Sequence, residues 1–156
     1  MTKVAAVTPP NLESVLPDAN FTDAYEVVVK QRAGSLIFVR RIMSSMPNWV
    51  SALLSLRNAM MATLGLKTDE VPSPGEKFGM FPVISTNDNR TILGFDDKHL
   101  DFRLVLDAAP AADQSTKVTL STVVKTHNLF GKAYLAVVMP FHRVIARTML
   151  ARAATL

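Results

Sequence analysis

The chain has 156 residues, of which 49% are apolar and 19% are charged, and its formal net charge is +4. This length suits one domain with a single core, and the apolar fraction excludes an extensively disordered chain. The 17 basic residues are scattered and do not interleave with aromatic residues, which argues against nucleic-acid binding. The absence of cysteine excludes disulfides, thiolate metal sites and a cysteine nucleophile.

The longest apolar run covers residues 133–141, far fewer than the roughly 20 residues that a membrane-spanning helix needs. We therefore expect no membrane span. Residues 1–10 contain one lysine and no apolar core ahead of Pro9, so they do not have the pattern of a secretory signal. A cytoplasmic location is the expectation that follows.

Residues 1–20 are expected to form an extended N-terminal arm, because they contain three prolines and little periodicity. Residues 21–156 are expected to form a single domain. Its first element is predicted at residues 24–30, where larger apolar residues alternate with polar or small ones, as in a short edge strand. A first helix could begin within residues 35–44.

Residues 47–64 are predicted to form an amphipathic helix, since Pro47 suits the first turn and Gly65 suits the end. On a helical wheel, Arg57 lies near the middle of an apolar face formed by Trp49, Val50, Leu53, Met60, Met61 and Leu64. Burying an unpaired guanidinium costs on the order of several kcal/mol. We therefore expect Arg57 to meet either a structural carboxylate, at Asp96, Asp97 or Asp101, or the anionic group of a ligand.

Four strands are predicted at residues 81–86, 91–95, 99–106 and 117–126, with polar turns between the first three. Together they are expected to form an antiparallel meander. In the third strand the even-numbered positions are apolar and the odd-numbered ones mainly polar, which predicts a sheet with one apolar side. The inward positions of the fourth strand are Val118, Leu120, Thr122 and Val124.

Residues 130–154 are predicted to form a long amphipathic helix that Pro140 should kink. Its inward stripe is expected to contain Tyr134, Val138, Phe141, Ile145 and Met149. The fold class is therefore α+β, an antiparallel meander packed against a long C-terminal helix and an earlier helical segment.

Several short motifs occur together along the chain. In chain order they are Met46-Pro47-Asn48-Trp49-Val50, Leu56-Arg57-Asn58, Gly94-Phe95-Asp96-Asp97-Lys98-His99-Leu100-Asp101-Phe102, Thr126-His127-Asn128, Gly131-Lys132-Ala133-Tyr134 and Pro140-Phe141-His142. In combination they resemble a bacterial family catalogued as domain of unknown function 2867. The resemblance runs from about Pro17 to Arg152.

That family is in turn similar to the helix-grip superfamily of START and Bet v 1 type ligand-binding domains. The resemblance implies a long C-terminal helix across an antiparallel sheet, enclosing an apolar cavity, although only about five strands are predicted for this chain. It also implies that related domains occur fused to nicotinamide-dependent short-chain reductases. This chain has no glycine-rich nucleotide-binding motif of its own, so no cofactor is expected.

Asp96, Asp97, His99 and Asp101 form a polar group near a predicted turn. Their types suit a metal, but no helical histidine pair supports one, so no metal site is expected. The structural interpretation is that these residues form a polar turn and a salt bridge that stabilises the fold. The functional interpretation is that His99 or Asp101 acts as a general acid or base.

His142 lies at the margin of the last helix's apolar stripe, two residues after Pro140. It could be satisfied by a free backbone carbonyl or a nearby acid, or it could face a pocket. Asn128 is expected to cap the start of this helix or to form a turn.

The sequence thus predicts a domain that binds a small apolar or amphipathic molecule, with Arg57 orienting the polar end of the ligand. The residues expected to line the ligand site are Arg57, Trp49, Met60, Met61, Tyr134 and Phe141. One alternative is an enzyme of cyclase, dehydratase or isomerase type that uses His99, Asp101 or His142 as its catalytic residue. A second alternative is a non-catalytic interaction module that pairs with a reductase or forms a homodimer.

Overall fold

The computed structural model describes residues 3–44, 77–78, 81–96 and 99–155. Within these ranges the elements are β1 (Ala5–Ala6), β2 (Phe21–Val29), α1 (Ser35–Ser44), β3 (Lys77–Phe78), β4 (Phe81–Thr86), β5 (Arg90–Asp96), β6 (Leu100–Pro110), β7 (Thr116–Thr126) and α3 (Leu129–Thr155). The helix predicted at residues 47–64, with Trp49, Arg57, Met60 and Met61, lies outside the described residues.

The described strands form one sheet in the order β1-β2-β7-β6-β5-β4-β3, and every neighbouring pair is antiparallel. The predicted meander is confirmed as β4 to β7, and the α+β class is confirmed. The sheet has more strands than the predicted five, because β1 and β3 are too short to show a sequence pattern. The strand predicted at residues 24–30 is confirmed as β2, but it is not a short edge strand, since β2 is nine residues long and lies between β1 and β7.

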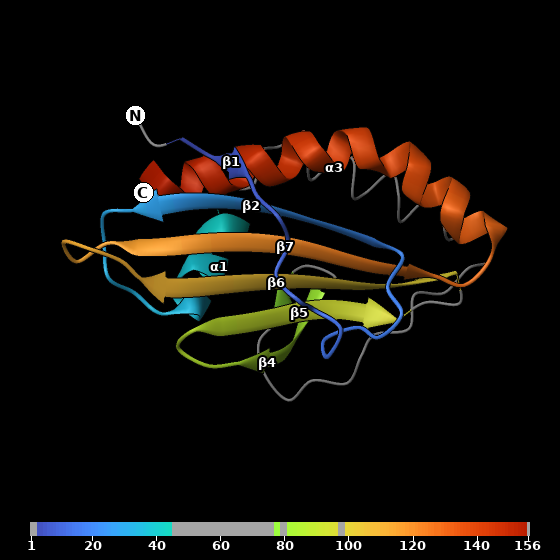
Figure 1. Ribbon diagram of the computed structural model, residues 1–156, viewed down its shortest axis with the longest axis horizontal. Helices are drawn as coiled ribbons and strands as arrows, with labels where there is room; N and C mark the ends of the chain where they lie inside the picture. The colour runs from blue at the N-terminus through green and yellow to red at the C-terminus, as the bar shows by residue number, and fades with distance from the viewer. Residues whose placement is uncertain (1–2, 45–76, 79–80, 97–98, 156) are drawn as a thin grey trace.

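One face of the sheet packs against α1 and the C-terminal half of α3 (Figure 1). The strands contribute alternate residues, as expected from the two-residue period of a strand. The main core on this side contains Tyr25, Val27, Val29, Phe38, Val39, Ile42, Val83, Leu93, Leu106, Ala108, Val118, Leu120, Ala146, Met149, Leu150 and Ala153. This face will be called the helix face.

The opposite face carries a second, smaller core beneath residues 3–20, which cross in front of the sheet in Figure 1. Leu12 and Leu16 pack there on Val105 and Val123. Asn20 fixes the end of this segment, because its side chain donates to Thr126 Oγ1 at 2.7 Å and accepts from the Thr126 N–H at 2.9 Å. The prediction of a single apolar side is therefore wrong. We call this second side the arm face.

Helix α1 begins where its first residue is tied to the turn between β4 and β5. The Ser35 N–H donates to the Asp88 carbonyl oxygen, and Ser35 Oγ donates to the Asn87 carbonyl oxygen at 2.6 Å. Asn87 Oδ1 also accepts from the Asn89 and Arg90 N–H groups, which closes the predicted turn. These bonds tie the start of α1 to the β4–β5 turn and satisfy the Ser35 N–H, one of the donors that the first turn of a helix leaves free.

The long helix α3 contains Pro140 and curves along the sheet (Figure 1). The predicted inward stripe is wrong at Phe141, whose exposure is 53%. Met149 of this stripe is buried, as predicted, and Tyr134, Val138 and Ile145 are half-buried. The other buried positions of α3 are Gly131, Ala146, Leu150 and Ala153, which the stripe did not include. Apolar residues surround most of this helix, so their spacing defines its inward side poorly, and the small alanines decide which side approaches the sheet closely.

Candidate functional site

Three polar side chains meet on the helix face, where the surrounding positions are apolar. Asp23 on β2 and Thr122 on β7 are directly opposite each other in the strand register. His142 approaches them from α3. The strand neighbours on either side of this pair are Tyr25 opposite Leu120 and Phe21 opposite Val124. A carboxylate, a hydroxyl and an imidazole thus converge between the sheet and its covering helix.

His142 Nε2 lies 2.8 Å from Thr122 Oγ1 and 3.8 Å from Asp23 Oδ1. The side chains of His142 and Asp23 are only 15% and 18% exposed, and Thr122 is buried. The first distance is a hydrogen bond, whereas the second is too long for one. The imidazole therefore bonds to the hydroxyl and stands beside the carboxylate without satisfying it.

Both carboxylate oxygens of Asp23 are buried, and within the described part of the chain neither has a hydrogen-bond donor. An ionised carboxylate is an acceptor with about four lone-pair positions, and leaving it unsatisfied away from water costs on the order of several kcal/mol. Buried polar groups in native proteins are nearly always paired. Asp23 is thus suited to accept hydrogen bonds from a donor that enters between the sheet and α3.

A small apolar pocket of about 10 Å³ lies on the same face, lined in part by strand neighbours of Thr122 and not by the three polar residues themselves. Leu104, which lines it, is the register partner of Thr122 on β6. The complete lining is Val39, Ile42, Met43, Leu93, Leu104, Leu106 and Leu120. This volume holds about one water molecule. Asp23, Thr122 and His142 therefore lie among apolar side chains of the helix face. Such an arrangement can orient a ligand that has one polar end.

The sequence-predicted polar group does not form one site. Asp101 pairs with His127 at 3.0 Å on the arm face. Asp96 pairs with Arg103 at 2.8 Å. His99 precedes β6 and is hydrogen-bonded to Asn128, and Asp97 lies outside the described residues. Among the residues that the structure describes, no group of histidine and carboxylate side chains is arranged to hold a metal ion.

His99 is tied to the start of α3. Asn128 Oδ1 accepts from the Gly131 N–H at 2.9 Å, so Asn128 is the N-cap of α3, as predicted. With that oxygen engaged, Asn128 Nδ2 donates to His99 Nδ1 at 2.9 Å. The His99 ring also lies 4.5 Å from the Phe130 ring, measured between centroids. These contacts give His99 a structural role at the junction of β6, β7 and α3.

Of the three catalytic candidates, the structure brings only His142 into the site. Asp23, 3.8 Å away, is the nearby acid that the sequence suggested for it. Tyr134 is half-buried on α3, and Phe141 is exposed. The other expected ligand residues, Trp49, Arg57, Met60 and Met61, lie outside the described ranges.

Asp23 was missed by the sequence reasoning, although a signal exists. It has the same parity as Phe21, Tyr25 and Val27, so it occupies an inward position of β2. A carboxylate at an inward position needs a partner or a ligand, because burying an unpaired charge is costly, and the same reasoning singled out Arg57 on its predicted helix.

The fold and this site define an α+β domain with a helix-grip-like arrangement, an architecture compatible with the binding of a ligand between helix and sheet. The family described as "Protein of unknown function (DUF2867)" matches residues 15–149, and the chain belongs to that family. No curated protein and no solved structure matches the chain.

Proposed function

We propose that this domain binds a small apolar or amphipathic molecule between α3 and the helix face of the sheet. The observation that carries the proposal is the buried carboxylate of Asp23, which has no donor among the described residues. The polar end of the ligand is a hydrogen-bond donor, such as a hydroxyl or an amine, because an ionised carboxylate accepts and cannot donate. Thr122 and His142 supply a second polar contact beside it.

The apolar part of the ligand extends along the pocket that begins next to Thr122. Because the pocket of about 10 Å³ is much smaller than an organic molecule, side chains must shift when the ligand enters. Met43 lines the pocket and is only partly buried. An unbranched thioether can change its rotamer at little cost, so Met43 is suited to make room.

Several finer expectations belong to the same proposal. Arg57 is proposed to meet an anionic group of the ligand, and Trp49, Met60, Met61 and Tyr134 are proposed to contact its apolar part. Phe141 is left out of this proposal, because its side chain is exposed on the outward side of α3. The resemblance to START and Bet v 1 type domains supports a cavity of this kind. A bacterial origin and a cytoplasmic location complete the proposal.

Native mass spectrometry of freshly purified protein tests this function, by comparison with the same sample denatured. We expect a small-molecule adduct on the wild-type protein that is lost in Asp23→Asn, because an amide cannot replace a charged acceptor. Asp113→Asn is the matched control, since Asp113 is exposed and has a φ of 55°, which asparagine tolerates well. The adduct should persist in this control.

A protein without any adduct, forming a stable dimer, would contradict the proposal and favour the interaction module. An adduct retained in Asp23→Asn but lost in Arg57→Leu would contradict the role of Asp23 and support that of Arg57.

The position of His142 beside Asp23 also favours a second candidate, an enzyme that moves a proton on its bound ligand. An imidazole that is hydrogen-bonded to a hydroxyl and lies beside a carboxylate can act as a general acid or base. The class is the cyclase, dehydratase or isomerase type, in which His142 would be the catalytic residue. His99 and Asp101 are alternative catalytic candidates, but each is engaged elsewhere by Asn128 and His127.

His142→Gln separates this candidate from simple binding. Its side-chain amide can keep the hydrogen bond to Thr122 but cannot exchange protons as an imidazole does. An enzyme should keep the adduct and lose its turnover, which mass analysis of the released ligand would detect. Identical ligand from the wild type and His142→Gln would exclude proton transfer by His142.

A further inference from the structure

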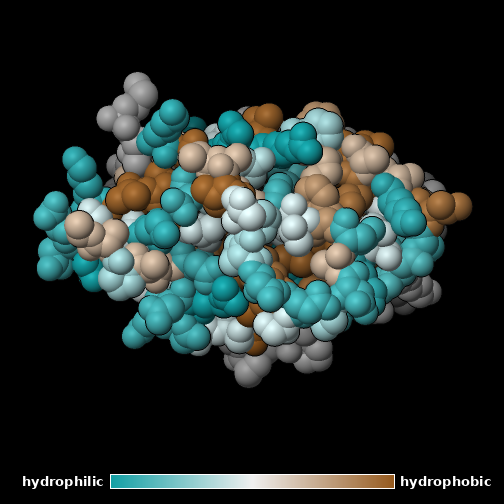
Figure 2. All heavy atoms as spheres, viewed as in Figure 1, coloured by the Kyte–Doolittle hydropathy of each residue, from teal (hydrophilic) through white to brown (hydrophobic). Residues whose placement is uncertain are grey.

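The outward side of α3 is apolar, although its inward side already contributes to the core. Val137, Phe141 and Val144 are 68%, 53% and 54% exposed, and their spacing places them on one side of the helix. Leu129, at the start of α3, is 82% exposed, and Phe130 is 39% exposed. We call these five residues the outer stripe. Figure 2 shows hydrophobic surface over α3 beside hydrophilic surface.

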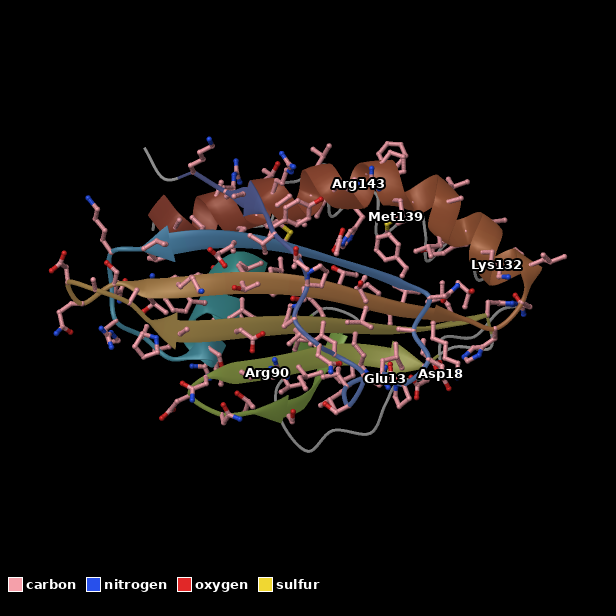
Figure 3. All side chains as sticks on the ribbon, in the orientation of Figure 1. Glu13, Asp18, Arg90, Lys132, Met139 and Arg143 are labelled. Carbon is pink, nitrogen blue, oxygen red and sulfur yellow. The ribbon has the colours of Figure 1, made fainter. Side chains whose placement is uncertain are left out.

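The charges on α3 are all positive. Its 27 residues contain Lys132, Arg143, Arg147 and Arg152, and no aspartate or glutamate. Lys132 and Arg143 are exposed along the helix (Figure 3). Arg147 lies over the Tyr25 ring, with 5.1 Å from Cζ to the ring centroid. Long basic side chains can lay their methylene groups on an apolar surface and reach outward with the charged end.

A surface complementary to this side of α3 must be both apolar and anionic. A second copy of the chain does not fit, because a symmetric contact through α3 would bring the basic residues of two helices together without a carboxylate on either. An anionic lipid bilayer fits both requirements, since its headgroups attract the cations and its acyl region accepts the outer stripe.

We propose that α3 docks the domain onto an anionic membrane surface through the outer stripe and its basic residues. By length and composition α3 could cross a bilayer, since its mean hydropathy reaches 1.3 over 18 residues. Its buried residues Ala146, Met149, Leu150 and Ala153 are part of the main core, however. The helix therefore lies in the interface plane, because crossing would require it to leave the core. This inference is independent of the proposed ligand site.

Vesicle co-sedimentation of the full chain tests the docking. The probes are phosphatidylcholine vesicles and vesicles in which phosphatidylglycerol replaces part of the phosphatidylcholine. We expect binding to the anionic vesicles that weakens as salt is added. Arg143→Gln combined with Lys132→Gln should weaken this binding about fivefold per charge removed, and should change the weak binding to phosphatidylcholine little.

Phe141→Ser should weaken the binding to both kinds of vesicle, by roughly tenfold on the anionic ones. Ile37→Ser is the matched control, because Ile37 is 45% exposed on α1, away from the outer stripe. It should bind as the wild type does. The proposal is overturned if the wild-type chain binds neither vesicle at low salt, or if Ile37→Ser loses as much binding as Phe141→Ser. A dimer that dissociates in Phe141→Ser, without vesicle binding, would instead identify the stripe as a protein interface.

Discussion

Gly131 determines how closely the start of α3 can approach the backbone of His99, just before β6. It is the fourth residue from the N-cap Asn128, counting the cap itself, and its N–H is held by that cap. A methyl group at this position would overlap the carbonyl oxygen of His99, a backbone atom that accepts from the His127 N–H at 2.8 Å. The absence of a side chain therefore allows α3 to start close to the backbone of His99, just before β6 begins.

Gly131→Ala should lower the free energy of unfolding by about 1–3 kcal/mol, because neither backbone can yield without breaking these hydrogen bonds. Urea denaturation followed by circular dichroism measures the change. Gly34→Ala is the control, since a methyl there meets Asp88 only at ordinary contact distances of 3.6 Å or more. A control variant that loses as much stability as Gly131→Ala would show that the overlap is not the cause.

At the scale of elements, residues 3–20 stabilise the sheet, because they contribute Leu12 and Leu16 to a second core on the arm face. Leu16 is 5% exposed and packs in the same cluster as Val105 and Val123 of the arm face. The sheet is therefore covered on both sides where β6 and β7 cross the middle of the molecule. The second core explains why Val105 is apolar although most odd-numbered positions of β6 are polar: its side chain packs beneath residues 3–20.

Leu16→Ala should reduce the free energy of unfolding by about 2–5 kcal/mol, the range for removing a buried leucine side chain. Leu129→Ala, at a position that is 82% exposed, should change it by no more than about 0.5 kcal/mol. Thermal or urea denaturation of both variants gives the comparison. Equal effects would mean that the small core does not stabilise the fold.

The elements with a regular polar and apolar alternation could be predicted from the sequence, and those without it could not. The strands β4 to β7 follow their pattern closely, and Thr122 is found at its predicted inward position. The inward side of α3 could be predicted only in part, correctly at Met149 and wrongly at Phe141, because apolar residues occur on both sides of this helix. Asp23 was overlooked because its importance depends on β7 and α3, which are distant in sequence and supply its neighbours.

At the scale of the whole molecule, β7 is the centre of the structure. It pairs with β6 along its full length and with β2 from Thr116 to Val124, and it is buried over most of its residues. We expect its amide hydrogens to exchange most slowly, at a rate set by global unfolding. The two-residue strands β1 and β3 should exchange fastest. Hydrogen exchange followed by mass spectrometry tests this order, and peptides of β7 that exchange as fast as β1 would contradict it.

The pairing of β2 with β7 also constrains the order of events during protein synthesis. Strand β2 is made early, but its partner is residues 116–126, so it must remain unpaired for about 5–20 s at ordinary ribosomal rates. During that time Tyr25, Val27, Val28 and Val29 form an exposed apolar strand of the kind that aggregates. Asp23 and Glu26 interrupt this strand with negative charge, a pattern that keeps nascent chains from associating. The carboxylate proposed to hold a ligand in the finished domain therefore also protects the unfinished chain.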